Sequence, residues 1–251
     1  SMTEAGQILY RHALNILSTK EQALFSLAQY EGRLEGDLSI ASSTVPQGYL
    51  LPNLLAAFRV QYPQITFTIR QFDSKGVMDA IISGAMDFGF VGTDTFCADL
   101  EVMLLCQARL VLITPRHGKY EHLEGTTISW DEIRHETFIL REEGSGSRTL
   151  FLKGLEAQGE DVSALSVVAT VENPDTIKQC VMAGLGVAVV SRRSVEDEIR
   201  LGLLKCFDIS GLDLVQNFYF ISHRNRVLSP IARAFQEFTA KYFQAHARPC
   251  E

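Results

Sequence analysis

The chain has 251 residues, of which 46% are hydrophobic and 21% are charged, and its net charge is -7. This charge argues against the broadly basic surface that nucleic-acid binding requires. No apolar run is long enough to cross a membrane, and no signal peptide is visible. The five cysteines are widely spaced and form no C-x-x-C pair, which is typical of small buried residues in a reduced compartment. We therefore expect a cytoplasmic globular protein with room for one large domain or two small ones.

A long helix is predicted over residues 3–30, because this segment lacks proline and places Leu9, Ala13 and Ile16 on one helical face. Gly32 then breaks the pattern. A separate amphipathic helix at one end of a chain is typical of a connector or a dimerisation arm. The alternative is a helix that packs on its own domain.

Residues 37–91 alternate between strand-like and helix-like segments. The predicted strands are 38–41, 66–72 and 88–91, and the predicted helices are 49–61 and 77–83. This β-α-β-α-β order implies a parallel sheet with helices on its faces.

A second alternation follows two strands that are predicted over 102–106 and 110–114. Its predicted strands are 137–140, 167–171, 187–190, 204–209 and 218–222, and its predicted helices are 130–133, 148–157, 175–183, 195–200 and 230–243. The sequence thus predicts two α/β units in series, bridged by two extended stretches. Clefts between such units are common ligand sites.

Three predicted strand-to-helix junctions carry hydroxyl or amide side chains. Their sequences are IASSTVPQGYLLP at 40–52, EGSGSR at 143–148 and TVENPDTIK at 170–178. All three lie at the carboxyl ends of predicted parallel strands, where ligands bind in open α/β sheets. Because the free N–H groups and the dipole of a helix N-terminus attract anions, we predict a shared site for a small anion.

Two features of the second junction strengthen this prediction. Gly144 and Gly146 allow the backbone to approach a ligand closely. Arg148 can bind an oxyanion through two charge-assisted hydrogen bonds. The alternative is that these side chains only cap their helices, and Asn173 before Pro174 has the pattern of a good cap.

Motifs of the common enzyme classes are missing from the sequence. It contains no G-x-S-x-G elbow, dinucleotide fingerprint or Walker A motif. His117 and His122 are the closest pair of histidines and lie in a polar loop, which is only a weak indication of a metal site. Cys106 and Cys180 are more typical of structural thiols than of nucleophiles. We expect no enzymatic activity, no metal and no cofactor, although scattered acids such as Asp73 leave a paired-carboxylate enzyme as an alternative.

Four segments together resemble the effector-binding half of the LysR-type transcriptional regulators. They are TEAGQILYRHALNIL at 3–17, GDLSIASSTVPQGYLLPNLLAAFRVQYPQITFTI at 36–69, GAMDFGFVG at 84–92 and VMAGLGVAVVS at 181–191. The loops ASSTVPQGYLLP and ILREEGSGSR, with the helix LSPIARAFQEF, most resemble a branch that includes regulators of sulfur and carbon assimilation.

The resemblance implies an α/β protein with two Rossmann-like subdomains and a cleft between them, the type-2 periplasmic-binding-protein fold, preceded by a long linker helix. It assigns the linker or dimerisation helix to 1–36, subdomain I to 37–113 and 223–251, and subdomain II to 114–222. It also implies a homodimer or homotetramer that binds DNA only through an N-terminal domain lying mostly outside this chain, with RNA polymerase as a further candidate partner. The opening Ser1-Met2 is typical of an expression scar and fits that expectation.

Carried over residue by residue, the family's effector contacts fall on nine positions. These are Ser43, Thr44, Val45, Thr93, Ser145, Gly146, Ser147, Arg148 and Asn173. Val45 stands where this branch usually has a second threonine, so one hydroxyl is lost while the backbone N–H remains. The expected function is a ligand-sensing domain that binds a small anionic metabolite in the cleft to control transcription.

Other interpretations remain open. A sulfur oxyanion, a small carboxylate and a phosphorylated sugar all suit the predicted effector site. A solute-binding protein of a transport system shares the expected fold, although the lack of a signal peptide and the N-terminal helix favour the regulator. An enzyme is a third alternative, because fold alone does not decide function.

Overall fold

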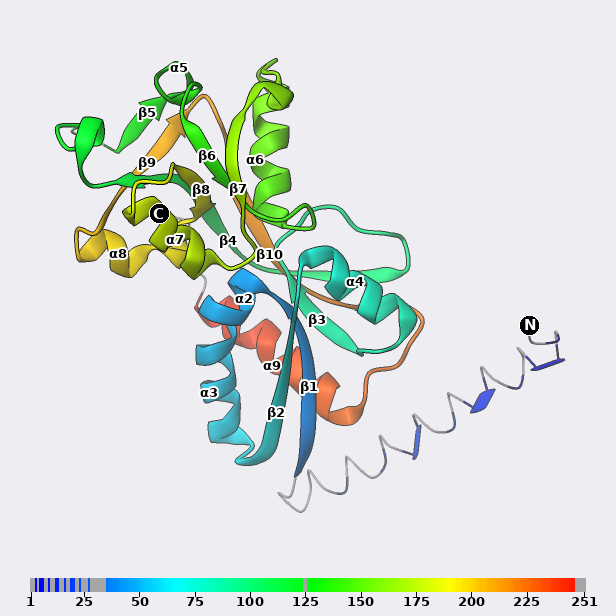
Figure 1. Cartoon of the computed structure of the whole chain (residues 1–251). Helices are drawn as coiled ribbons and strands as arrows, with labels where there is room; N and C mark the ends of the chain where they lie inside the picture. Colours follow the sequence, from blue (N-terminus) through cyan, green and yellow to red (C-terminus); the bar gives the residue numbers. More distant parts are fainter. Residues whose placement is uncertain are drawn as a thin grey trace.

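The computed structural model describes residues 35–123 and 126–246, together with isolated positions between 3 and 27 (Figure 1). The helix predicted over 3–30, and with it most of the linker assigned to 1–36, lies outside the described residues apart from those positions. Three of these positions hold large hydrophobic side chains that are exposed, namely Leu9, Ile16 and Leu27. The linker helix therefore stays a prediction.

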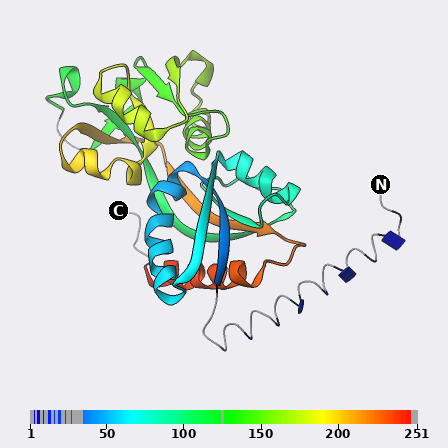
Figure 2. The same ribbon diagram turned by 60° about the horizontal axis from the view of Figure 1, so that its bottom comes forward.

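Two lobes make up the rest of the molecule, and both views of the ribbon separate them (Figures 1 and 2). We call lobe I the part built from β1–β3, α2–α4 and α9, and lobe II the part built from β5–β9 and α5–α8. Lobe I contains β1 (Glu35–Ser43), α2 (Thr44–Tyr49), α3 (Leu51–Gln61), β2 (Gln64–Phe72), α4 (Ser74–Ser83), β3 (Phe88–Val91) and α9 (Pro230–Ala245).

The strands of lobe I form the predicted parallel sheet. β1 lies between β2 and β3 and pairs with both in parallel, so that Ser43 is opposite Phe72 and Ser42 is opposite Phe90. The carboxyl ends of all three strands consequently meet at one edge of the sheet. This edge faces lobe II, and it is where the site described below lies (Figure 1).

Two long strands, β4 (Leu100–Pro115) and β10 (Val215–His223), connect the lobes (Figure 1). The separate strands predicted over 102–106 and 110–114 are one continuous strand, because each successive part of β4 has a partner. Its first part pairs with β10, and its last part pairs with β8 (Ala188–Ser191) and β9 (Leu204–Ser210), all antiparallel. The resulting sheet has the order β2-β1-β3-β10-β4-β9-β5.

Lobe II contains shorter elements in a mixed arrangement. They are η1 (Gly118–Tyr120), β5 (Thr127–Ser129), α5 (Trp130–Ile133), β6 (Thr137–Leu140), α6 (Gly146–Ala157), η2 (Val162–Ala164), β7 (Ser166–Thr170), α7 (Pro174–Met182), η3 (Arg192–Ser194) and α8 (Glu196–Arg200). β6 pairs with β7 in parallel, and β5 pairs with β9 in parallel. The strands and helices predicted for the second alternation are therefore present, but the strands belong to two different sheets.

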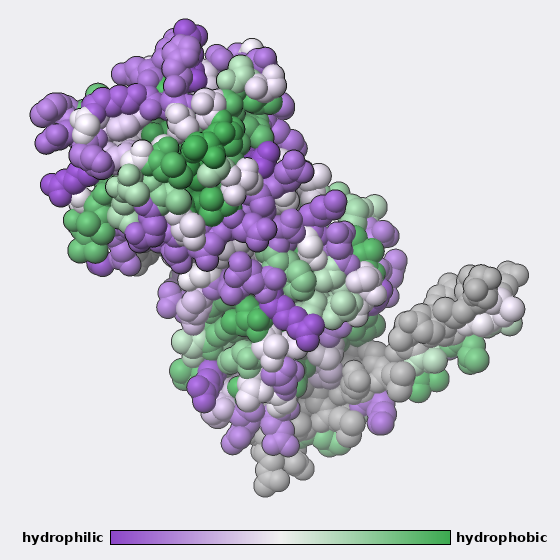
Figure 3. All heavy atoms as spheres, in the orientation of Figure 1, coloured by the Kyte–Doolittle hydropathy of each residue, from purple (hydrophilic) through white to green (hydrophobic). Residues whose placement is uncertain are grey.

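Each lobe has a hydrophobic core of its own. In lobe I, Phe58 and Phe88 pack with Phe235 from α9. In lobe II, Phe138 packs against Phe151 from α6. Both cores also include residues of the connecting strands, but they share none with each other. The region between the lobes is therefore free to be polar, and Figure 3 shows hydrophilic residues where the two lobes meet. The predicted subdomain boundaries remain a prediction.

The cysteines depart from the expectation of buried thiols. Cys97 is exposed, because it lies in the loop before β4, while Cys106, Cys180 and Cys206 are half-buried. Burial raises the pKa of the Cys206 thiol, which disfavours its thiolate form. Cys250 lies outside the described residues. Among the helices of the described chain, none combines the length and apolar character that a membrane span requires.

Candidate functional site

The first predicted junction leads from β1 directly into α2. Ser43 occupies the N-cap position and is buried, yet its side chain makes no cap hydrogen bond. The helix predicted over 49–61 corresponds to α3, which begins at Leu51. The separate short helix α2 precedes it from Thr44, because Pro46 is tolerated in the first turn, where its missing N–H removes no helical hydrogen bond. Thr44 and Val45 therefore lie in a first turn whose N–H groups lack a side-chain cap.

The second junction, between β6 and α6, has the same property. Ser145 is the N-cap residue of α6 and again makes no side-chain cap hydrogen bond. Its hydroxyl lies 3.0 Å from that of Ser147, and both serines are buried. At α2 and α6 the serines thus leave first-turn N–H groups uncapped, in contrast to the alternative that they serve as caps.

Asn173 at the third junction does cap its helix. Its side-chain oxygen accepts hydrogen bonds from the backbone N–H groups of Asp175, at 2.7 Å, and Thr176, at 3.3 Å. Pro174 follows as the first residue of α7. This oxygen is therefore already used by the helix, and a contact between Asn173 and an effector stays a prediction.

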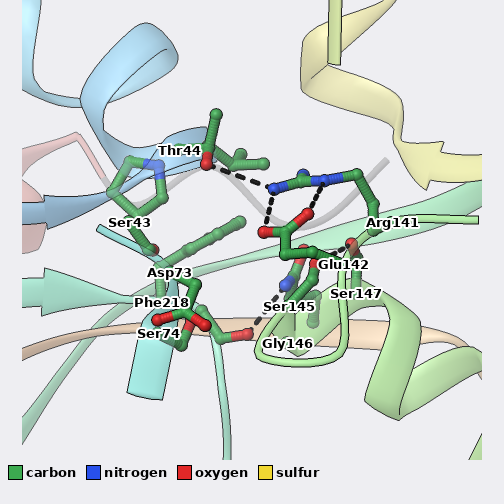
Figure 4. Close-up of a pocket in the computed structure, with 14 residues that line it drawn as sticks. Ser43, Thr44, Asp73, Ser74, Arg141, Glu142, Ser145, Gly146, Ser147 and Phe218 are labelled. Carbon is green, nitrogen blue, oxygen red and sulfur yellow. Dashed lines mark hydrogen bonds and ion pairs between the residues drawn. The ribbon is translucent and has the colours of Figure 1, made fainter. Parts of the chain in front are cut away.

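An inner cavity of about 20 Å³ lies between the lobes, at the starts of α2, α4 and α6 (Figure 4). Of the predicted effector contacts, Ser43, Thr44, Val45, Ser145, Gly146 and Ser147 line it. The prediction did not include the other lining residues, which are Pro46, Asp73, Ser74, Gly92, Arg141, Glu142, Gln216 and Phe218. The residues come from both lobes, and the volume holds about one water molecule.

A larger outer cavity of about 290 Å³ adjoins the inner one. The two share Thr44, Asp73 and Glu142 as lining residues, and Glu172 also lines the outer cavity. Thr93 lines a third cavity of about 50 Å³, which shares Gly92, Gly146 and Gln216 with the inner one. Thr93 accordingly lies beside the inner cavity and not in its wall.

Arg141 is the cationic side chain of the inner cavity, and it is only 6% exposed. Its Nε and Nη2 donate hydrogen bonds to the two carboxylate oxygens of Glu142, at 2.8 and 2.7 Å. Nη2 also donates to the hydroxyl oxygen of Thr44, at 3.2 Å. Since Thr44 belongs to lobe I and Arg141 follows β6 in lobe II, the guanidinium group bridges the lobes (Figure 4).

Arg148 takes a different position from the one its sequence context suggests. Its Nη1 donates a hydrogen bond to the backbone carbonyl of Arg141, at 2.9 Å. Arg148 is not among the residues that line the inner or outer cavity. It therefore supports the segment that carries Arg141, and direct contact with an effector stays a prediction.

The two loop glycines allow the lobes to approach each other. A Cβ atom at Gly144 would overlap the carboxylate of Asp73, and one at Gly146 would overlap the backbone carbonyl of Gly92. The sequence predicts that these glycines allow a ligand to approach the backbone closely. In this structure they make room for lobe I, which brings the loop before α6 into contact with the ends of β2 and β3.

Gln216 on β10 adds a hydrogen-bond acceptor to the cavity wall. Its Nε2 donates to the carbonyl of Gly92 at 2.8 Å, which fixes the orientation of the side-chain amide. The other end, Oε1, is buried and has no hydrogen-bond partner among the described residues. A buried acceptor of this kind favours a ligand or solvent donor in the cavity.

Some of the missed residues had a recognisable signal in the sequence. Asp73 and Ser74 follow β2 as the chosen serines follow β1, and Asp73 accepts a hydrogen bond from the N–H of Gly76 to cap α4. Arg141 directly follows an apolar strand at the junction already selected. Gln216 had no such signal, because only the pairing of β10 brings it to the site. Within the described residues, no group of His, Cys, Asp or Glu could hold a metal ion.

Comparisons with known proteins agree with this architecture. Residues 31–244 match the family described as LysR substrate binding domain. The chain is 30% identical over 240 residues to an uncharacterized HTH-type transcriptional regulator of Methanocaldococcus jannaschii, an alignment that covers 96% of this chain and 80% of that protein.

Two solved structures share the fold. The effector binding domain of QuiR in complex with shikimate has a TM-score of 0.76 at 18% identity, covering 85% of this chain and 99% of that one. The regulatory domain of CcmR from Synechocystis, in complex with 2-phosphoglycolate, has a TM-score of 0.75 at 23% identity, covering 84% and 98%. The fold is thus the type-2 periplasmic-binding-protein fold of LysR effector-binding domains. The chain belongs to the LysR family, and it is the effector-binding domain of a LysR-type transcriptional regulator.

Proposed function

We propose that the inner and outer cavities form one effector site, in which a small metabolite binds with its anionic group at Arg141. The observation that carries this proposal is the burial of the Arg141 guanidinium in a cavity lined by both lobes. A buried cation with several N–H donors in a fixed plane is well suited to an oxyanion. Nearby, Ser43, Ser145 and Ser147 supply hydroxyls.

The volumes of the two cavities indicate which part of a ligand each one would hold. The inner cavity, about 20 Å³, has no room for a metabolite, whereas the outer one, about 290 Å³, approaches the roughly 300–1,000 Å³ of common ligand pockets. The body of the ligand would occupy the outer cavity and its anionic group would reach inwards. Shikimate and 2-phosphoglycolate, which the two neighbouring structures hold, both carry an anionic group, and they support the proposal by analogy.

Ligand binding would act through the geometry of the lobes. A ligand that binds one arrangement of the lobes more tightly than another shifts the population towards it. β4 and β10 connect the lobes, so their bending would accompany the change. In the proposed assembly, a homodimer or homotetramer, this change would reach DNA-binding domains attached before residue 1, and RNA polymerase is a further candidate partner. The proposal places the protein in the cytoplasm, assigns it no catalytic step, and leaves no role for the transport alternative.

The test is a thermal-shift screen at constant ionic strength, because a ligand that binds only the folded state raises the melting temperature. The ligands are sulfate, sulfite, thiosulfate, phosphate, 2-phosphoglycolate and small carboxylates. We expect at least one anion to stabilise the protein in a dose-dependent manner. Arg141→Ala should weaken its binding at least about 30-fold, since loss of one partner of a buried charge pair costs roughly 2 kcal/mol or more.

The matched control is Arg59→Ala, which removes an exposed arginine from α3 and should leave the affinity unchanged. Arg148→Ala should weaken binding less than Arg141→Ala, because Arg148 supports the backbone of Arg141. Equal anion affinities in the wild type and in Arg141→Ala would refute the proposed site.

A further inference from the structure

Arg141 already holds a carboxylate, and this carboxylate belongs to the protein. Nε and Nη2 of Arg141 bind the two oxygens of Glu142 in the planar, two-point arrangement that guanidinium groups form with carboxylates. Glu142 is the next residue in the chain, and its side chain is 17% exposed, against 6% for Arg141. We call these two nitrogen atoms the carboxylate subsite.

Glu142 also lies between the two cavities. It lines the inner cavity and the outer cavity, and the cavities share Thr44 and Asp73 beside it. A ligand that enters the outer cavity therefore meets Glu142 before it can reach the guanidinium of Arg141. Direct contact between a ligand anion and the carboxylate subsite requires Glu142 to leave it.

The charges around the subsite restrict what can replace Glu142. Asp73 and Glu172, two further acids, line the outer cavity, and Arg141 is the only cation that lines the inner or outer cavity in the described part of the chain. Exchange of one carboxylate for another keeps the charge at Arg141 the same and keeps the planar two-point geometry. A dianion such as sulfate would add negative charge next to Asp73.

We propose that Glu142 is an internal ligand, which occupies the carboxylate subsite of the effector site until a small carboxylate displaces it. This inference rests on the proposed function and deepens it, because it names the chemical class of the effector and the residue that competes with it. Glu142 thereby sets the effector concentration at which the site fills. It also keeps the buried Arg141 paired when the effector is scarce, since an unpaired buried charge is strongly destabilising.

The experiment compares Glu142→Gln and Glu142→Ala with the wild type and with Glu143→Gln. Glu143 is a matched control, because it is the adjacent residue, carries the same charge and is exposed. Acetate and sulfate are the probes, measured by calorimetry and thermal shift at constant ionic strength. Removal of the competing carboxylate should lower the dissociation constant for acetate about tenfold or more. Acetate then forms its charge-assisted hydrogen bonds with Arg141 without first breaking those between Arg141 and Glu142.

Three results would support the proposal. The Glu142 variants should melt at a lower temperature than Glu143→Gln without ligand, acetate should reverse this loss, and sulfate should reverse it less. If a Glu142 variant is unfolded in plain buffer, refolding in acetate but not in chloride of equal ionic strength is the supporting result.

Two results would overturn it. The first is an acetate affinity that is the same in Glu142→Gln, Glu143→Gln and the wild type, while another anion still binds the wild type at Arg141. In that case the proposed function is supported, and the proposed role of Glu142 as an internal ligand is refuted. The second is an unfolded Glu142 variant that acetate does not refold.

Discussion

Two buried cations stand near the boundary between the lobes, and they differ in their partners. Lys178 on α7 has a side chain that is 10% exposed, and its Nζ lies 2.8 Å from carboxylate oxygens of both Asp175 and Glu198. Arg141 is 6% exposed and has one carboxylate partner, Glu142, together with the hydroxyl of Thr44. Arg141 also lines a cavity between the lobes.

The difference separates a structural cation, Lys178, from an exchangeable one, Arg141, whose partner anion can be replaced. Burial disfavours the charged form of Lys178, but its hydrogen bonds to Asp175 and Glu198 outweigh this effect and raise its pKa. Two acids that come from neighbouring elements of the same lobe leave no position for a ligand anion. Arg141 has one acid, adjacent in sequence, and space beside it, so an anion from solution can take that place. Burial and charge alone do not mark a binding site, whereas an incomplete set of partners beside a cavity does.

Removal of the structural cation should give the largest effect on stability. We expect Lys178→Met to lower the free energy of unfolding by about 3 kcal/mol, because it leaves the partly buried Glu198 without its cation. Urea denaturation at neutral pH measures this, with Lys241→Met on the exposed face of α9 as the control. Anion affinity should stay the same. A strong loss of anion affinity in Lys178→Met would show that the two cations do not differ as described.

A change in the shape of the exchangeable cation should give the next largest effect. Arg141→Lys keeps the positive charge but removes the planar pair of donors, so the dissociation constant for the best anion should rise about tenfold. Calorimetry measures this change. Full affinity in Arg141→Lys would mean that charge alone, and not the two-point geometry, recognises the ligand.

Substitutions at the two N-cap positions should give the smallest effects, mainly on stability for Asn173 and mainly on anion binding for Ser145. Asn173→Ala should cost about 1 kcal/mol of stability, because Asn173 accepts hydrogen bonds from two N–H groups of α7. Ser145→Ala should cost clearly less, since Ser145 makes no side-chain cap, but it should weaken anion binding several-fold. If Ser145→Ala were instead the more destabilising of the two substitutions, Ser145 would act as a helix cap.

Much of the fold could be predicted from periodicity. The strand at 88–91 and the helix at 130–133 have the predicted bounds, and most other elements differ by a few residues. β4 was predicted as two strands, because the polar residues Gln107 and Arg109 interrupt its apolar pattern. Its continuity depends on tertiary pairing with β10, β8 and β9, which no local pattern reveals.

The candidate site was predictable where local chemistry defines it. Serines at the starts of α2 and α6 are recognisable from strand-to-helix patterns, and the structure brings them together at one cavity. The identity of the cationic side chain was not predictable in this way. Arg141 lies in the loop after β6 and Arg148 in the first turn of α6. Only the three-dimensional course of this junction places Arg141 in the cavity, while Arg148 donates to its backbone carbonyl. Gln216 likewise reaches the site only through the pairing of β10.

The proposed function depends on one contact, between a ligand anion and the buried guanidinium of Arg141. A crystal structure of the protein with the anion that raises the melting temperature most tests it directly. We expect two ligand oxygens within hydrogen-bond distance of Nε and Nη2 of Arg141, with the Glu142 side chain turned away from them. A ligand bound elsewhere, with the pair between Arg141 and Glu142 intact, would contradict it.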